Sequence, residues 1–257
     1  MGINDEDEMT QVKQGQVTDT ETADITWKNL YIVGGTTALI TIGVGVIEIL
    51  ITFLPGGNVS YETVIDWFTL FQHNWFLGLR NLGFLNIFLT LLGIPTFLAL
   101  YGAHRQVNQA FAMLAMIISF IGVAVFLATN RAFAMFELSH QYAAATTAAQ
   151  QATIVAAGQT MLSIGKSHTL GSFLGFFLSE VAGIIISGVM LQGKIFSKVA
   201  AYAGVAGFSI LLIFDIISAF VPRLDNMAMI FAMIGGLLTM VWHILLARRF
   251  FQLGREG

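Results

Sequence analysis

Glu180 is the residue of this sequence best placed for chemistry, because it stands near the middle of the apolar stretch TLGSFLGFFLSEVAGIIISGVML (169–191). A carboxyl group at that depth in a bilayer is costly unless it is paired, hydrogen-bonded or functional. Asp215, inside the next apolar stretch (196–221), is a second acid of this kind. The two acids predict a polar site within a membrane protein.

Four more polar residues fall within apolar stretches, in the outer half of the predicted bundle. Depths follow from a helical rise of about 1.5 Å per residue. They place two arginines and two acids in the same half of the membrane, where their charges balance and pairing offsets the cost of burial. The predicted cluster consists of Arg80, Asn86, Asn130, Arg131, Glu180 and Asp215.

This cluster has two interpretations, and the sequence leaves both open. In the first, it lines an outward-facing polar pocket that binds a small polar or amphipathic ligand, or relays protons. Glu180 is then the titrating group, with Arg131 and Arg80 setting its charge state or binding an anion. In the second, the charges only hold the helices together in register.

A metal site is a weaker candidate on the outer side of the bundle. His73, His140 and His168 all fall there, and Glu137 stands three residues before His140. Such residues can bind a metal ion, but no compact HExxH-type spacing accompanies them, so three unrelated interfacial histidines are the alternative. No other cofactor is predicted. His243 is the only histidine expected well inside a helix, so a bis-histidine haem is disfavoured.

Composition identifies a membrane protein. Of the 257 residues, 56% are hydrophobic and only 11% are charged, whereas soluble proteins carry about 25% charged residues. There is no cysteine, and neither a P-loop nor a GxSxG motif is present. No basic cluster suggests nucleic acid. We therefore expect a non-enzymatic protein, with an intramembrane enzyme, metal-dependent or not, and a structural or accessory subunit as the alternatives.

Six apolar stretches are each close to the roughly 20 residues that cross a bilayer. The fold class expected is an all-α polytopic bundle, with one or two extramembrane amphipathic helices on the outer side, at 58–75 and 139–168. An acidic tail (1–26) is expected to be disordered, and 251–257 to form a second tail, flanking a transmembrane domain over 27–250. The predicted spans are 29–54, 76–101, 110–138, 169–191, 196–221 and 226–247, with a short turn at 103–109.

Lysine and arginine set the expected orientation. With the N-terminus inside, eight of these residues fall on the cytoplasmic side and four on the other, which favours cytoplasmic termini in the cell membrane. The expected partners are the lipid bilayer and a small-molecule ligand, without nucleic acid. Gly171 and Gly175 suit close helix packing, within the chain or in a homo-oligomer.

Three segments carry a resemblance to a known family. They are LYGAHRQVN (100–108), ATNRAFAMFELSHQY (128–142) and the alanine-rich run YAAATTAAQQATIVAAGQTML within 139–162. Together they resemble an uncharacterised family of bacterial and archaeal six-helix membrane proteins, catalogued only as a domain of unknown function. The resemblance covers residues 28–250. It implies a six-helix topology and brings no activity, cofactor or catalytic residue.

Overall fold

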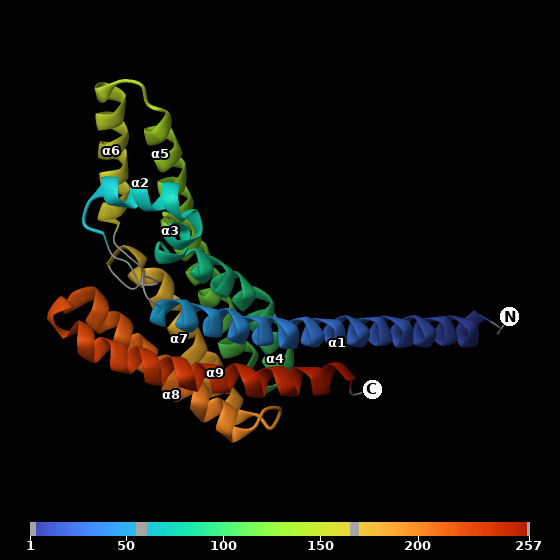
Figure 1. Ribbon diagram of the computed structural model, residues 1–257. Helices are drawn as coiled ribbons and strands as arrows, with labels where there is room; N and C mark the ends of the chain where they lie inside the picture. The colour runs from blue at the N-terminus through green and yellow to red at the C-terminus, as the bar shows by residue number, and fades with distance from the viewer. Residues whose placement is uncertain (1–3, 55–60, 165–169, 256–257) are drawn as a thin grey trace.

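The computed structural model describes residues 4–54, 61–164 and 170–255. Every regular element within these residues is a helix, so the prediction of an all-helical protein is confirmed (Figure 1). In chain order the helices are α1 (Asn4–Phe53), α2 (Val64–His73), α3 (Trp75–Asn81), α4 (Phe84–Thr129), α5 (Ala132–Ala144), α6 (Ala148–Ser163), α7 (Leu170–Gln192), α8 (Lys198–Phe220), the 3-10 turn η1 (Pro222–Leu224) and α9 (Asp225–Arg255).

Helices of membrane-spanning length and apolarity dominate the described part of the chain. Five are long and apolar enough to cross a bilayer, as expected for a multi-pass membrane protein. They are Trp27–Thr52, Phe84–Ala144, Leu170–Gln192, Lys198–Phe220 and Met227–Arg255.

The second of these helices folds back on itself. Asn108, inside α4, has non-helical dihedral angles of φ −155° and ψ 84°. At the far end, Asn130 Nδ2 donates to the carbonyl oxygen of Gly83 over 3.3 Å, so the end of α4 returns to its beginning. A turn over 103–109 was predicted here. The helix instead continues through His104 and bends at Asn108.

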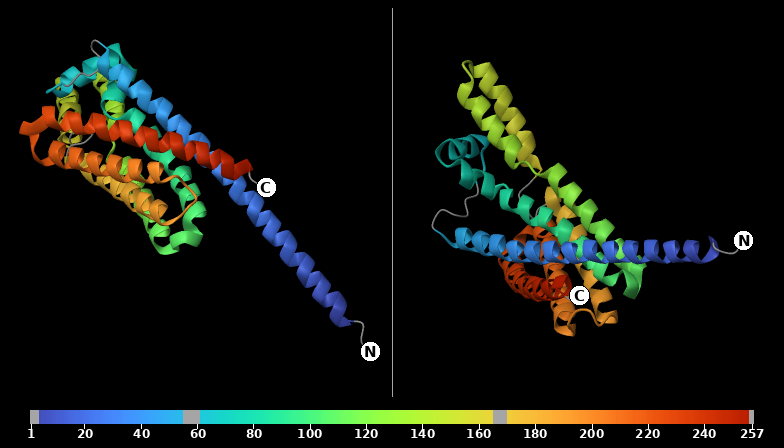
Figure 2. Two further views of the ribbon diagram at one scale, coloured as in Figure 1. Left: turned by 90° about the horizontal axis from the view of Figure 1, so that it is seen from below. Right: turned by 90° about the vertical axis from the view of Figure 1, so that its right-hand side faces the viewer.

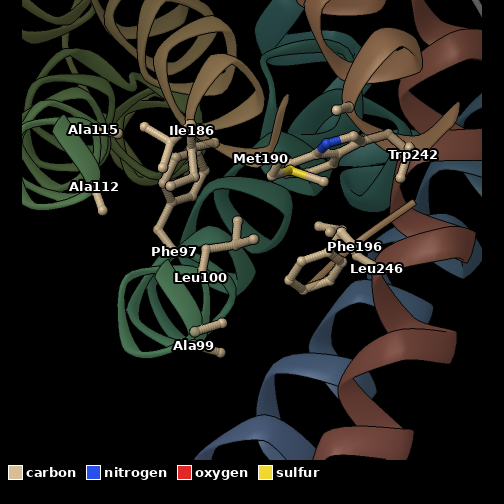
Figure 3. Packing of buried hydrophobic residues seen from close by; sticks show 14 of the residues in the cluster. Phe97, Ala99, Leu100, Ala112, Ala115, Ile186, Met190, Phe196, Trp242 and Leu246 are labelled. Carbon is tan, nitrogen blue, oxygen red and sulfur yellow. The ribbon is translucent and has the colours of Figure 1, made fainter. Parts of the chain in front are cut away.

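Five helices pack around the main core in a closed order. α1 contacts α4, α4 contacts α7, α7 contacts α8, α8 contacts α9, and α9 returns to α1. The start of α1 and the end of α9 point to the same side of the molecule (Figures 1 and 2). Figure 3 shows the core between the helices, where Ile186 lies beside Phe97 and Leu100, and Met190 lies beside Trp242.

Glycines permit the closest approaches in this bundle. A Cβ at Gly204 of α8 would meet the Ser187 hydroxyl of α7 and the Trp242 indole of α9. On the opposite flank, Thr37 of α1 and Thr96 of α4 share a hydrogen bond of 3.0 Å between their hydroxyls. Small residues and inter-helical hydrogen bonds of this kind stabilise helix contacts in membranes.

A second, smaller cluster stands at the end away from both termini. α5 and α6 form a hairpin that rises from the bundle, and α2 crosses its base (Figure 1). Trp67, Phe68 and Met135 are the largest fully buried side chains in its core. Thr147 and Gln150 form a capping box that starts α6, the arrangement that satisfies the free N–H groups of a first turn.

Helix boundaries differ from the expected ones in several places. The helix expected over 76–101 breaks at Leu82 and Gly83, between α3 and α4, because Gly83 has a positive φ of 91°. Residues 4–26, expected to be a disordered tail, continue α1 as helix. α9 extends to Arg255, so residues 251–255 of the tail expected at 251–257 are helical, and Phe250 just before them is fully buried. The helix expected over 110–138 is interrupted at 130–131, where Asn130 Oδ1 accepts from the backbone of Ala132.

Candidate functional site

Glu180 of α7 and Asp215 of α8 form the centre of the candidate site. Their residues are only 6% and 0% exposed, and the two carboxyl groups lie within hydrogen-bonding reach of each other. A carboxylate can only accept hydrogen bonds, so a hydrogen bond between two carboxyl groups needs one proton between them. The site is therefore suited to holding a shared proton.

Helix register brings the two acids together. α7 and α8 run antiparallel, because Ser187 lies against Gly204 and Gly183 lies against the ring of Phe208. In this antiparallel register, residues that precede Ser187 in α7 lie beside residues that follow Gly204 in α8. Glu180 and Asp215 therefore lie on the same side of the Ser187–Gly204 contact. The glycines let the two backbones approach closely enough for the short Asp215 side chain to reach its neighbour.

Arg80, at the end of α3, is paired with Glu48 of α1. Its Nε donates to Glu48 Oε2 over 3.1 Å, and one terminal nitrogen donates to the Glu48 carbonyl oxygen over 3.1 Å. It also donates to the Thr52 hydroxyl and, over 2.8 Å, to Asn81 Oδ1. Glu48 was not among the site residues predicted from the sequence. The sequence feature that could have identified this partner of Arg80 was the pair Glu48 and Thr52, which stand one helical turn apart in an apolar stretch.

Arg131 lies far from Glu180 along the bundle axis. α4 and α7 run antiparallel, with Gly122 against Ser179 and Phe126 lying against Gly175. This register sets Arg131 near the start of α7, about ten residues, or about 15 Å, from Glu180. The structure thus divides the six predicted residues into an acid pair and an arginine group.

The two asparagines of the predicted cluster belong with the arginine group. Asn130 joins the end of α4 to the carbonyl oxygens of Leu82 and Gly83. Asn86 is half-buried in the first turn of α4. Both side chains lie at the end of the bundle that carries α3 and α5, away from the termini.

Polar atoms continue from the acid pair toward the end of the bundle that carries the termini. Glu180 Oε2, Ser187 Oγ and Trp242 Nε1 are buried without a hydrogen-bond partner among the described residues. Ser187 and Trp242 both lie against Gly204. Buried polar atoms of this kind are normally satisfied by ordered water.

His104 is a buried group that the sequence analysis missed. It is 0% exposed, its ring stacks on Phe196 at 5.2 Å between centroids, and its Nδ1 lies 2.9 Å from the Leu100 carbonyl oxygen. A carbonyl only accepts, so Nδ1 carries the hydrogen. Nε2 is then a buried acceptor without a partner in the described chain. The expectation that His243 is the only histidine deep in a helix was wrong.

The candidate metal ligands are dispersed. His73 ends α2 and is exposed, Glu137 accepts from Gln141 over 3.0 Å, and His140 packs against Phe136. His168 lies outside the described residues. Within the described ranges, no three histidine or acidic residues gather as a metal site would require.

Comparisons with protein-family models, with curated proteins and with solved structures found no match for this chain. The resemblance to a six-helix family therefore stays a prediction.

Proposed function

We propose that this multi-pass membrane protein binds and relays protons at the Glu180–Asp215 pair, and couples that step to movement of protons or a small ligand across the membrane. The observation that carries the proposal is the contact between two buried carboxyl groups on adjacent helices. Acidic side chains of this kind inside a membrane are typical of proton relays.

The proposal includes six membrane crossings. α4 has 46 residues, about twice the length that one crossing needs. It bends at Asn108, and its two ends meet through Asn130 and Gly83. Two crossings by α4 and one each by α1, α7, α8 and α9 give six. The α5–α6 hairpin and α2 then stand outside the bilayer, opposite cytoplasmic termini.

A relay rather than an ionic clasp is supported by the signs of the charges. A clasp between helices gains its stability from opposite charges, but the charged side chain that acts on Glu180 is another acid. Two acids in contact repel each other unless they share a proton. Gain and loss of that proton changes the interaction between α7 and α8, which is what coupling to transport requires.

The buried polar atoms beyond the pair offer a path for the proton. Ser187 and Trp242 lie along α7 and α9 on the way to the termini. His104, at the same end of the bundle, presents a free acceptor nitrogen. Water molecules bridging these groups would connect the pair to the cytoplasmic side. The Ser187 hydroxyl and the His104 ring can accept and then donate a proton in turn, whereas the Trp242 indole N–H only donates a hydrogen bond to such a water.

Proton flux into liposomes tests the proposal. The protein is reconstituted with a pH-sensitive dye inside the vesicles, and an imposed pH gradient is followed with time. Glu180→Gln and Asp215→Asn should each lower the protein-dependent rate at least tenfold, since an amide does not exchange a proton at neutral pH. Glu137→Gln, which alters an exposed acid in α5, is the control and should keep the wild-type rate.

The relay and the clasp predict different results for Glu180→Gln. In a relay, the variant should keep its thermal stability, because its amide can still hydrogen-bond to Asp215, but it should lose proton flux. In a clasp, the variant should lose thermal stability. If the variant loses stability, and wild-type vesicles conduct protons no faster than empty ones under both proton and membrane-potential gradients, the proposal fails.

A further inference from the structure

Arg131 is a buried arginine whose charge has no visible counterpart. Its residue is 5% exposed at the start of α5, and its Nε is fully enclosed without a hydrogen-bond partner among the described residues. No ion pair of Arg131 occurs in residues 4–54, 61–164 or 170–255. An isolated buried guanidinium costs several kcal/mol unless an opposite charge and hydrogen bonds compensate it. Something outside the described chain is needed to supply that charge.

The surroundings of Arg131 offer further donors. Asn130 connects this point to Gly83, so the start of α5 lies beside the end of α3. At that end, Asn81 Nδ2 is a buried donor without a partner in the described chain, while Asn81 Oδ1 already accepts from Arg80. A group that satisfies both Asn81 Nδ2 and Arg131 must be an acceptor.

The charge balance of this junction selects an anion rather than a neutral acceptor. Arg80 is held by Glu48, so the positive charge left at the junction is that of Arg131. The N-terminus of α5 adds a positive partial charge, and Arg131 occupies its N-cap position without a side-chain capping bond. Helix N-termini favour phosphate and other anions, and a guanidinium is shaped to bind two phosphate oxygens.

Exposed aromatic rings beside the junction point to the source of the anion. Phe133 is 55% exposed two residues after Arg131, and Phe76 and Phe88 are 39% and 45% exposed. Phe84 contacts all three rings, at 5.1 to 6.5 Å between centroids. An aromatic group at the edge of the bilayer next to a basic group is suited to a lipid, with its chains on the rings and its phosphate on the arginine.

We propose that Arg131, Asn81 and the N-terminus of α5 form a binding site for a phosphate-type anion, with the headgroup of an anionic lipid as the favoured source. This site is independent of the proton relay. It lies about 15 Å along the bundle from Glu180, by the helical rise and the α4–α7 register, and shares no residue with it. Failure of one proposal leaves the other unaffected.

Ligand-dependent stability tests the site. The full-length protein is purified in phosphatidylcholine nanodiscs, and its unfolding temperature is followed as phosphatidylglycerol replaces phosphatidylcholine. In a second arm, inorganic phosphate is added to the phosphatidylcholine sample, with potassium chloride at equal ionic strength as its control. A bound anion stabilises the folded protein in proportion to its affinity. Native mass spectrometry of the wild type then identifies the bound mass.

Arg131→Gln should weaken the response to the anion at least about tenfold, as expected for loss of a charge-assisted contact. Arg223→Gln is the matched control, because Arg223 is an exposed arginine in η1 at the same end of the bundle. It should leave the response unchanged. If Arg131→Gln does not fold, Arg131→Lys keeps the charge without the planar fork, and should bind more weakly than the wild type.

The two arms identify the source. A response to phosphatidylglycerol alone supports the site with a lipid as its ligand. A response to inorganic phosphate beyond that to chloride supports the site with a soluble anion. The proposal is overturned if neither anion stabilises the wild type and no lipid or phosphate mass is retained, or if Arg131→Gln responds as the wild type does.

Discussion

The carboxyl group of Glu180 lies within hydrogen-bonding reach of the carboxyl group of Asp215, across the contact between α7 and α8. Both residues are buried in a bundle whose neighbouring elements are apolar helices. The arginines expected to neutralise these acids belong to a separate group, where Arg80 binds Glu48. The proton proposed to lie between the two acids therefore takes the place of the cation expected from those residues.

Gly204→Ala should destabilise the bundle. The added methyl group would meet Ser187 and the Trp242 indole, whose nearest ring atoms stand 2.5 Å from the Cβ position. Overpacking of this kind costs about 1–3 kcal/mol. Gly188→Ala, on the same α7 helix as Ser187, is the control because a Cβ there meets nothing within 4 Å. Unfolding free energies in mixed micelles measure both, and equal stabilities would contradict the packing described.

Glu48→Ala should destabilise the protein by roughly 2–4 kcal/mol. The substitution leaves the Arg80 side chain, 4% exposed, without the carboxylate that holds it. The cost is below the upper limit for a buried pair because the Glu48 side chain is 29% exposed. Glu62→Ala, at an exposed acid before α2, should change the free energy of unfolding by less than about 0.5 kcal/mol. Similar losses in the two variants would show that the ion pair contributes little.

Thr147→Ala should weaken α6 locally by about 1 kcal/mol. The Thr147 hydroxyl accepts from the Gln150 backbone over 3.2 Å, and the Gln150 side chain accepts from the Thr147 backbone over 3.2 Å. Thr153→Ala, in the exposed middle of the same helix, is the comparison. Hydrogen exchange of the α6 amides should become faster only in Thr147→Ala. Faster exchange in both variants, to the same extent, argues against a specific role for the cap.

Single cysteines can test the two crossings proposed for α4, because the natural chain has none. Thr153→Cys lies in α6 and Gln106→Cys lies just before the bend of α4, both at exposed positions. A membrane-impermeant thiol reagent should label Thr153→Cys in intact cells. It should label Gln106→Cys only after the membrane is opened. Labelling of both from the same side would exclude two crossings by α4.

The sequence was sufficient to predict the class of fold, because composition and long apolar stretches depend on the bilayer rather than on detailed packing. It could not predict where helices break within those stretches. The bend of α4 lies at Asn108, near the end of the turn expected at 103–109. Residues 103–107 stay helical because they pack against α1, where Arg105 lies over the Trp27 ring at 4.3 Å. Asn130 breaks the following segment because its side chain bonds the backbone locally.

The acids were predictable, but their partners were not. Glu180 and Asp215 stand out because they interrupt apolar runs, and pairing them needs only antiparallel neighbours. The partner of Arg80 depended on the depth of Glu48, which stands five residues before the end of α1 and seven positions before Pro55 in sequence. His104 gave no signal, because its burial comes from Phe196, which is 92 positions away in the chain.

Infrared difference spectroscopy of the protein in a lipid bilayer tests the shared proton most directly. A protonated carboxyl group and a carboxylate absorb at separate frequencies, so one buried protonated carboxyl should be visible in the wild type at neutral pH. The band should be lost in the double variant Glu180→Gln, Asp215→Asn and kept in Glu137→Gln. A wild-type spectrum with no such band, or a band that the double variant leaves unchanged, would contradict a proton held between Glu180 and Asp215.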